Sequence, residues 1–337
     1  MSTIKILTAS TGKAGEKTLK AGELAEALTN VKSGWLDILN PGETEKEFML
    51  DNLKFHPLAV EDCFADPVDR AQHFKSIRGA SDYETHRFVV LKARDADSEL
   101  DTEYLLVFLT DSLLVTVRNT EIPSVEKFRD RYKSIRQQKR LEKGPEFLLY
   151  ELLDSVADDW MDILSNYSNK LDELEDRVFD PHTKYSNLLE SLHEIKQDLR
   201  EIQKSIIPLQ NIVGRLLRPD EDLISEENYL YFRDLADVIK GLVIKVENYS
   251  SGAASTRDTY LSQVSVRLSE SNARLSEVMT TLTVIGSIML PLSLVAGIAG
   301  MNIGSDFDFT QIMFVMITFA AIMLFYFYRK GWIGPQK

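Results

Sequence analysis

The fold of this chain is decided by two uncharged stretches near its C-terminus. Residues 278–305 read VMTTLTVIGSIMLPLSLVAGIAGMNIGS, and residues 309–328 read FTQIMFVMITFAAIMLFYFY. A helix needs about 20 mainly apolar residues to cross the hydrocarbon of a bilayer, and both stretches reach that length. We therefore predict a membrane protein with two spans, residues 278–302 and 309–328, joined by an external turn, residues 303–308.

The flanking charges predict the orientation of these spans. The polar N-terminus lacks the apolar core of a cleavable export signal, so the residues before the first span are expected to stay in the cytoplasm. A basic tail, residues 329–337, follows the second span, whereas the turn carries Asp306 and Asp308. By the positive-inside rule, both termini are predicted to be cytoplasmic, with the protein in the inner (cell) membrane.

Composition excludes several classes of protein. The chain has 39 Lys and Arg against 52 Asp and Glu, a net charge of −13, which argues against a nucleic-acid partner. One cysteine, Cys63, and five dispersed histidines cannot build a disulfide framework or a Cys/His zinc cluster, so metal chemistry is expected to use oxygen. No Walker motif, glycine-rich phosphate loop or nucleophile elbow occurs. Nothing in the sequence looks catalytic, so we predict neither an enzyme nor an organic cofactor.

Residues 1–142 are predicted to form a cytoplasmic α/β domain, because β-rich apolar runs alternate with helical patterns. One of the helices is expected to open with a capping box of Thr44 and Glu47. The expected strands are residues 4–7, 35–39, 88–91, 104–109 and 113–117, and the expected helices are residues 21–28, 44–53 and 125–138.

Residues 143–277 are predicted to form a helical stalk. Pro181 and Pro219 divide this region into an αα hairpin and a third helix. No proline follows until Pro291, so the third helix can run from about Glu226 through the first span, roughly 75 residues or 110 Å. The acidic residues of the stalk are expected to be solvated helix faces; they include Asp154, Asp158, Asp159 and Asp162.

Two stripes run along this third helix. One is a heptad seam of Leu261, Leu268, Leu275, Leu282 and Met289, with Val264, Ser271, Val278, Ile285 and Leu292 three positions on. About a quarter turn away lies a small, mostly polar face: Asp258, Ser262, Ser265, Ser269, Asn272, Ser276, Met279, Thr283, Gly286, Leu290, Ser293, Gly297 and Gly300. Parallel copies sealed along the seam would turn this face toward a shared lumen, so we interpret it as pore lining. Close helix contact through small residues is the alternative.

A motif stands at the end of the first span. Gly300-Met301-Asn302 follows LPLS at residues 290–293 and AGIA at residues 296–299. FHPLAVEDC at residues 55–63 and YFRD at residues 231–234 precede it. With these segments in this order, the sequence resembles the CorA family of magnesium channels over essentially its whole length. The resemblance implies an α+β membrane protein assembled as a homopentameric funnel, with a cytoplasmic α/β domain, a long helical stalk and two C-terminal transmembrane helices, the first lining the pore.

The resemblance also implies roles for the motif. The asparagine of the triplet forms a selectivity ring at the pore mouth, a role that falls on Asn302. Such a ring of amide oxygens can hold hydrated Mg²⁺ through its waters without the tight grip of carboxylates. Gly300 would allow close packing at the turn, and Met301 would pack against neighbours.

Deeper residues are expected to shape the conduction path. By resemblance, Met279 is the main apolar gate, and Leu290 would form a further constriction that closes by dewetting. Ser293 and Gly297 would offer hydroxyl and carbonyl oxygens. The expected pore lining is Ser276, Met279, Thr283, Gly286, Leu290, Ser293 and Gly297.

The basic residues after the second span match a cluster that the family places around the stalk near the inner membrane face. Here they are Arg329 and Lys330. Ordinary positive-inside anchoring is the alternative interpretation.

The sequence also departs from the family pattern, which leaves the ion open. The usual Met-Pro-Glu-Leu segment is missing from the outer turn, where Asp306 and Asp308 could supply comparable negative potential, and Ser276 replaces an asparagine one turn before the gate. A Mg²⁺ channel that also passes Co²⁺ or Ni²⁺ is predicted. The alternative is a ZntB-like proton-coupled Zn²⁺ transporter, although neither span holds an acidic or histidine residue for proton coupling. A membrane-anchored scaffold without transport is a third hypothesis.

Charge predicts how the protein is regulated. All of the acidic excess precedes the first span, where the net charge is −14, so several copies would repel one another in the cytoplasm. We expect cytoplasmic Mg²⁺ to bind between subunits and hold the channel closed when the ion is plentiful. By resemblance one ligand is Asp234, and its partner across the interface is Asp97 or Asp95. The expected partners are thus further copies of the chain, membrane lipid and divalent cations.

Overall fold

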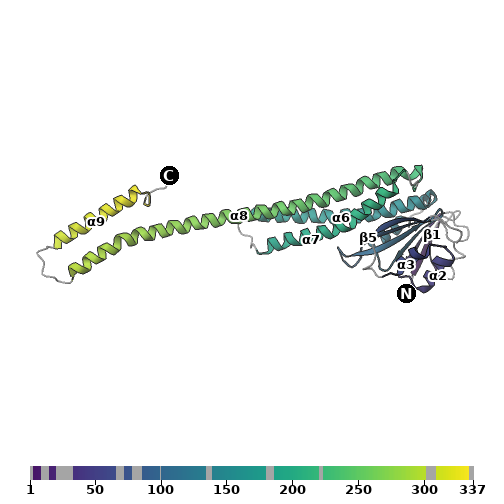
Figure 1. The fold of residues 1–337 in the computed structure, drawn as a ribbon, viewed down its shortest axis with the longest axis horizontal. Helices are drawn as coiled ribbons and strands as arrows, with labels where there is room; N and C mark the ends of the chain where they lie inside the picture. The colour runs from purple at the N-terminus through teal and green to yellow at the C-terminus, as the bar shows by residue number, and fades with distance from the viewer. Residues whose placement is uncertain are drawn as a thin grey trace. The chain divides into compact units, whose positions relative to one another are not determined.

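The computed structural model describes residues 3–8, 15–19, 33–65, 72–77, 86–98, 100–133, 139–179, 186–219, 223–300 and 309–333. The chain forms two units, Met1–Arg257 and Asp258–Lys337. Within the first unit, a mixed sheet carries helices on both faces (Figure 1).

The sheet of the first unit has the strand order β2-β1-β3-β7-β6-β5-β4. Only β3 and β7 pair in parallel, and the other neighbours are antiparallel. The five expected strands are confirmed, and two strands were not predicted, β2 and β4. The strands are β1 (Thr3–Thr8), β2 (Gly15–Leu19), β3 (Gly34–Leu39), β4 (His73–Ile77), β5 (His86–Arg94), β6 (Thr102–Leu109) and β7 (Leu113–Arg118).

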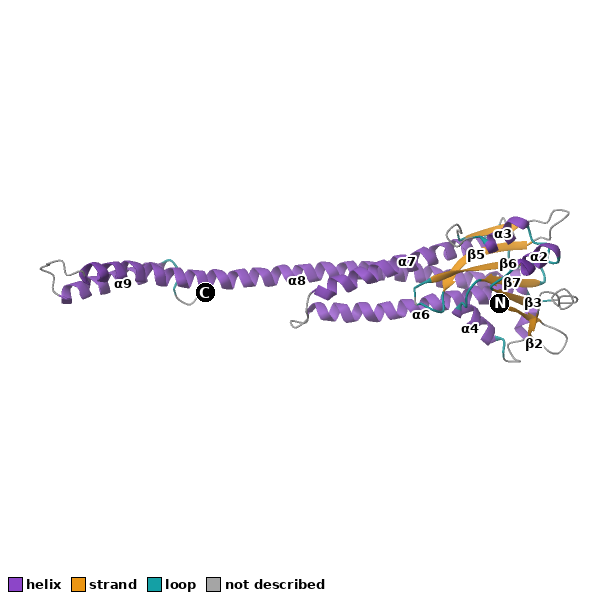
Figure 2. Cartoon of the chain, turned by 90° about the horizontal axis from the view of Figure 1, so that it is seen from below, coloured by secondary structure: helices purple, strands orange, loops and turns teal. Residues whose placement is uncertain are grey.

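The core lies on both faces of this sheet because the central strands are apolar throughout. On one face, α2 (Glu43–Asp51) and α3 (Pro57–Phe64) cover a cluster in which Phe55 stacks on Phe108, with ring centroids 4.3 Å apart. On the other face lie α4 (Pro123–Arg131), α6 (Pro145–Phe179) and α7 (Ser186–Leu216). Figure 2 shows these helices running beside the strands.

The start of α2 corrects one prediction. The expected capping box of Thr44 and Glu47 is wrong, because the helix begins at Glu43 with Gly42 as its N-cap. Glu45 therefore occupies the third helical position, and its carboxylate accepts a hydrogen bond of 2.8 Å from the amide of Gly42.

Two predicted helices fall partly or wholly beyond what the structure describes. The helix expected at residues 21–28 lies outside the described residues. The helix expected at residues 125–138 is confirmed as α4, which ends at Arg131, and residues 134–138 are outside the described part. A short 3₁₀ turn, η2 (Lys139–Lys143), precedes α6.

Three long helices follow, as predicted. α6 and α7 form the expected hairpin, and α8 (Glu226–Gly300) is a single helix of 75 residues with Pro291 inside it. α9 (Phe309–Arg329) completes the chain. Among the described residues, α8 and α9 are the two helices long and apolar enough to cross a membrane.

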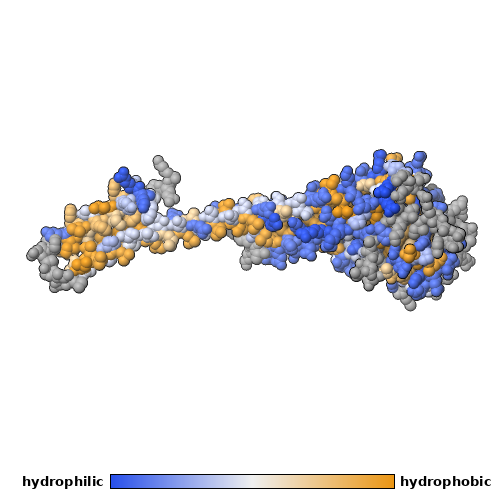
Figure 3. Space-filling model, viewed as in Figure 1, coloured by the Kyte–Doolittle hydropathy of each residue, from blue (hydrophilic) through white to orange (hydrophobic). Residues whose placement is uncertain are grey.

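The second unit exposes its apolar side chains. Across its described residues, only Tyr260, Val284 and Phe327 are buried apolar side chains. Figure 3 shows the apolar surface gathered over α9 and the C-terminal part of α8. The seam residues Leu268 and Leu275 are 61% and 60% exposed, so no described residue covers the predicted seam at these positions.

Candidate functional site

The predicted pore-lining residues all lie on α8 and are spaced three or four apart, which places them on one face of the helix. Most are exposed in the single chain, and Gly286 is half-buried. The two predicted constrictions are bulky and open, with Met279 64% and Leu290 73% exposed. The face therefore has no partner of its own within the described chain.

The glycines on this face are not required by packing inside one chain. A Cβ added at Gly286, Gly297 or Gly300 would meet no described atom within 4 Å. Their small size therefore leaves open space beside α8 that no described residue fills.

The threonines of this region direct their hydrogens into the helix. The hydroxyl of Thr283 donates to the carbonyl of Met279 at 2.7 Å, and that of Thr280 donates to the carbonyl of Ser276 at 2.8 Å. Because each hydroxyl hydrogen is engaged, the oxygen faces its surroundings as an acceptor. Waters around a cation point their hydrogens outward, and such oxygens can receive them.

This bond alone does not mark a pore. On α9, the hydroxyl of Thr318 donates to the carbonyl of Phe314 at 2.8 Å in the same way. Back-bonding is the general means by which a hydroxyl is satisfied in an apolar helix. The position of Thr283 on the small face distinguishes it from Thr318.

The outer mouth lies mostly beyond the described residues. Gly300 is the last residue of α8. The other predicted mouth residues are outside the described part; they are Met301, Asn302, Asp306 and Asp308.

The predicted regulatory acids come from different elements of the first unit. Asp234 is exposed on α8, and Asp97 is exposed after β5. Asp95 lines an open groove of about 690 Å³ with Glu201 of α7, and Asp234 is not among the residues that line it. In the described residues, no group of three His, Cys, Asp or Glu side chains could hold a metal ion. A site built on Asp234 therefore needs ligands from elsewhere.

Asp234 lies beside an aromatic cluster that involves its own YFRD segment. Tyr231 of that segment packs on Phe147 and Tyr150 of α6, with ring centroids 5.2 and 5.3 Å apart. Burial raises the pKa of the Tyr150 phenol, and the nearby carboxylates of Asp154 and Asp234 raise it further. Lys143 donates to the hydroxyl of Tyr231 at 3.2 Å. The segment thus anchors α8 on α6.

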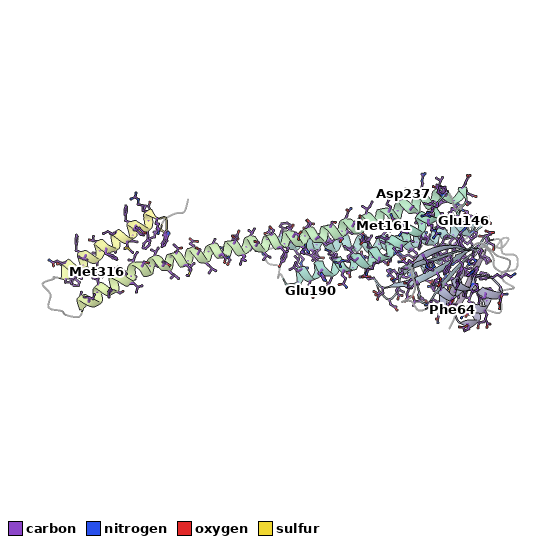
Figure 4. The ribbon with its side chains drawn as sticks, in the orientation of Figure 1. Phe64, Glu146, Met161, Glu190, Asp237 and Met316 are labelled. Carbon is purple, nitrogen blue, oxygen red and sulfur yellow. The ribbon has the colours of Figure 1, made fainter. Side chains whose placement is uncertain are left out.

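A carboxylate that sequence reasoning missed fixes the start of α8. Glu146, labelled in Figure 4, accepts from the guanidinium of Arg87 on β5 at 2.9 Å. It also accepts from the backbone amide and the hydroxyl of Ser225 at 3.1 and 2.7 Å, and from the side-chain amide of Asn228 at 3.1 Å. Burial favours the neutral acid, but these hydrogen bonds outweigh it and lower the pKa of Glu146. We name this group the Glu146 clasp.

A local signal for the clasp was present. Ser225 precedes the helix by one residue, and serine at that position is a common N-cap. Its partner Glu146 lies 79 positions away, so the contact itself has no sequence pattern.

The prediction that the acidic residues of α6 are solvated holds in part. Asp158 and Asp162 are exposed, but Asp159 is buried and pairs with Lys127 of α4 at 2.5 Å. Arg131 of α4 pairs with Asp154 and Asp158 at 3.2 and 3.0 Å. These acids join α4 to α6 instead of facing solvent alone.

Comparison with known proteins identifies relatives by sequence. Residues 32–329 match the family described as CorA-like Mg2+ transporter protein. The chain is 28% identical over 309 residues to the putative metal ion transporter YfjQ of Bacillus subtilis, covering 90% of this chain and 91% of that protein. It is 30% identical over 293 residues to the cobalt/magnesium transport protein CorA of Thermotoga maritima, covering 82% and 77%.

Solved structures share the fold. The CorA magnesium transporter from Methanocaldococcus jannaschii aligns over 99% of both chains, with a TM-score of 0.64 and 20% identity. The ZntB cytoplasmic domain from Vibrio parahaemolyticus aligns over 78% of this chain and 98% of its own, with a TM-score of 0.60 and 15% identity. The match over residues 32–329 places this chain in the CorA family, and it is a membrane transporter of divalent metal ions, not an enzyme.

Proposed function

We propose that the protein is a homopentameric channel that moves hydrated Mg²⁺, and also Co²⁺ or Ni²⁺, across the cell membrane. The observation that carries this proposal is the exposed face of small and polar residues on α8, which no described residue of the chain covers. The matched family is described by Mg²⁺ transport, and one relative is named for cobalt and magnesium. Five such faces would line one path for ions.

Selection takes place at the outer mouth. Asn302 presents its amide oxygen to the waters of the ion, while Gly300 and Met301 shape the turn behind it. Asp306 and Asp308 raise the local cation concentration through their negative potential.

The path then runs along α8 toward the cytoplasm. Ser293 and Gly297 supply oxygens, and Leu290 forms an apolar constriction. Gly286, Thr283 and Ser276 continue the small face, with the main gate at Met279. A ring of thioether side chains closes such a path by excluding water.

The division of the chain follows from this path. Residues 1–142 form the cytoplasmic α/β domain, residues 143–277 the stalk, residues 278–302 and 309–328 the spans, and residues 303–308 the outer turn. The cytoplasmic tail, residues 329–337, places Arg329 and Lys330 as a basic ring at the inner membrane face.

Cytoplasmic Mg²⁺ regulates the channel in this proposal. Asp234 of one subunit and Asp97 or Asp95 of the next hold the ion through oxygen ligands, which suit Mg²⁺. The exposure of Asp234 and Asp97, and the lack of a three-ligand metal group within the described residues, support a site shared between subunits. Asp234→Ala would then leave the channel insensitive to internal Mg²⁺, while Asp237→Ala, an exposed neighbour on α8, is the matched control.

A ZntB-like proton-coupled Zn²⁺ transporter is the second candidate. The structural likeness to the ZntB cytoplasmic domain favours it. The spans oppose it, because residues 278–300 and 309–328 contain no acidic or histidine side chain to carry a proton.

Ion flux into liposomes that contain the purified full-length protein tests the proposal. Mg²⁺, Co²⁺, Ni²⁺ and Zn²⁺ are compared with and without a proton gradient, beside Asn302→Ala. We expect Mg²⁺ uptake that is indifferent to the gradient and reduced by the substitution. Zn²⁺ uptake that rises with the gradient would support the ZntB-like candidate, and no flux of any ion would favour a scaffold.

A further inference from the structure

The end of α9 is closed by a complete C-terminal cap. The amide of Gly331 donates to the carbonyl of Tyr328 at 3.1 Å, and the amide of Trp332 donates to the carbonyl of Phe327 at 3.0 Å. Gly331 has a φ of 76°, a left-handed conformation that glycine adopts without steric cost. These bonds form a Schellman motif, which turns the chain back over the last turn of the helix.

The reversal places an indole ring on the helix. Trp332 stacks on Phe327, with ring centroids 5.5 Å apart and an interplanar angle of 15°. Phe327 is the one buried side chain of α9, at 5% exposed, whereas Trp332 is 41% exposed. Residues 330–332 therefore fold back over the last turn of α9, and the Trp332 ring remains partly exposed.

Lys330 is held by this surface. Its ammonium lies 4.9 Å from the ring centroid of Trp332 and 5.6 Å from that of Tyr326. The faces of the two rings attract the ammonium group, but they are weak hydrogen-bond acceptors. The N–H groups of Lys330 can therefore still donate to another acceptor. Residues 309–333 contain no acidic residue, so this stretch of chain offers no carboxylate to neutralise the charge.

Lys330 lies directly after the end of an apolar helix, α9. α9 is long and apolar enough to cross a membrane, and its final turn brings tyrosine, tryptophan and basic side chains together. Tyrosine and tryptophan favour the headgroup level of a bilayer, and a lysine there attracts anionic lipid. Charge and position both indicate a phosphate group from the membrane as the partner.

We propose that residues 326–332 form a binding site for the headgroup of an anionic phospholipid. Lys330, positioned by Tyr326 and Trp332, binds the lipid phosphate, and the Gly331 cap holds the three side chains together. The site rests on α9 spanning a membrane, as the proposed function requires, but not on which ion is carried. The lipid site lies at the same inner membrane face as the proposed basic ring of Arg329 and Lys330, so Lys330 belongs to both and Arg329 to the ring alone.

Quenching of tryptophan fluorescence by brominated lipid tests this site in the reconstituted full-length protein. Trp35 and Trp160 are buried in the other unit, so the difference between wild type and Trp332→Phe isolates Trp332. Brominated phosphatidylglycerol and brominated phosphatidylcholine are compared at equal mole fraction. We expect about fivefold enrichment of the anionic lipid around Trp332, the size expected for one lysine at a charged surface.

Three variants locate the source of the enrichment. Lys330→Gln should abolish the preference while quenching by phosphatidylcholine persists, and Gly331→Ala should do the same by disrupting the cap. Arg329→Gln is the matched control and should keep the preference. Equal quenching by the two lipids in the wild type, or a preference that survives Lys330→Gln, overturns the site. Ion flux measured in the same vesicles is a separate readout, so an inactive protein that keeps the preference contradicts only the proposed function.

Discussion

In the unit Met1–Arg257, the large apolar side chains of the central strands are buried, whereas in Asp258–Lys337 most are exposed. Val107 and Leu114 have no exposed surface, while Leu268 and Phe314 are 61% and 73% exposed. The first unit builds its own core from one chain. The described residues of the second unit bury few apolar side chains, so the proposed assembly and the membrane would have to cover them.

Buried charged groups lie in the first unit, whereas the two spans of the second unit contain no charged side chain. The first unit buries Asp37, which pairs with Arg118 at 2.9 Å and also with Arg129. Thr116 donates to the same carboxylate at 2.7 Å. In the second unit, the uncharged spans satisfy hydroxyls through their own helix carbonyls. Mutations in the first unit should therefore change folding, and mutations in the second should change assembly or flux.

The largest effect is expected at the buried charges. Asp37→Ala leaves Arg118 and Arg129 without this carboxylate in a dry setting, which should lower the free energy of unfolding by about 3–5 kcal/mol. Denaturation of the detergent-purified protein, followed by the fluorescence of Trp35 and Trp160, measures this. The matched control Asp111→Ala, at an exposed turn, should change it by less than about 0.5 kcal/mol. Equal effects would refute a special role for the buried group.

The Glu146 clasp should give the next largest effect. Glu146→Ala removes the acceptor for Arg87, Ser225 and Asn228, so the same denaturation should show a loss of about 2–3 kcal/mol. Glu190→Ala, an exposed glutamate on α7, is the control and should have little effect. An unchanged midpoint in Glu146→Ala would show that the clasp contributes nothing to folding.

The clasp also predicts a pH dependence. Because its native pKa is lowered, the Glu146 carboxylate stabilises the fold above its unfolded-state pKa of about 4.5, and this contribution is lost as pH falls through the native pKa. Glu146→Gln should therefore be less stable than wild type at neutral pH, and the difference should shrink on acidification. A difference that stays constant with pH would remove ionisation as the cause.

The seam tests whether the second unit is stabilised by assembly. Leu268→Ala should weaken association by about 2 kcal/mol per subunit, because a leucine that packs between copies loses its burial. The stability of the first unit should stay unchanged in this variant. Val266→Ala, an exposed apolar residue away from the seam, is the control. Subunit number measured by light scattering distinguishes them, and equal behaviour of both variants would argue against the seam.

The smallest effect is expected at a single hydroxyl. Thr283→Val removes an outward acceptor from the small face without changing side-chain volume, and should lower Mg²⁺ flux about fivefold, or 1 kcal/mol. Thr318→Val deletes the same kind of back-bonded hydroxyl on α9 and should leave flux unchanged. If both variants lose flux equally, the small face does not line the path.

The helices and central strands were predictable because their signals are local. Proline begins α6, and Pro181 and Pro219 stand in the connections after α6 and α7, while apolar runs mark β6 and β7. The strands β2 and β4 were missed because they are sheet edges, with the sequences GEKTL and HFKSI, where charge and polarity replace alternation.

The candidate site was predictable only in part. The small face of α8 follows from helical spacing, and its exposure agrees with an external partner. The contacts of Asp37 and Glu146 were not predictable, because their partners lie 59 to 92 positions away along the chain. Local patterns place residues on a face, but they do not say which distant side chains meet there.

Pro291 gives the C-terminal part of α8 a built-in requirement for hydration. Proline has no amide hydrogen, so the carbonyl of Ser287, four positions earlier, lacks its usual donor. In a dry hydrocarbon setting, such an oxygen would cost several kcal/mol. A water molecule could meet this need, because a Cβ added at the neighbouring Gly286 would meet no described atom within 4 Å. The most apolar stretch of the chain is therefore one that cannot be fully dehydrated at low energy.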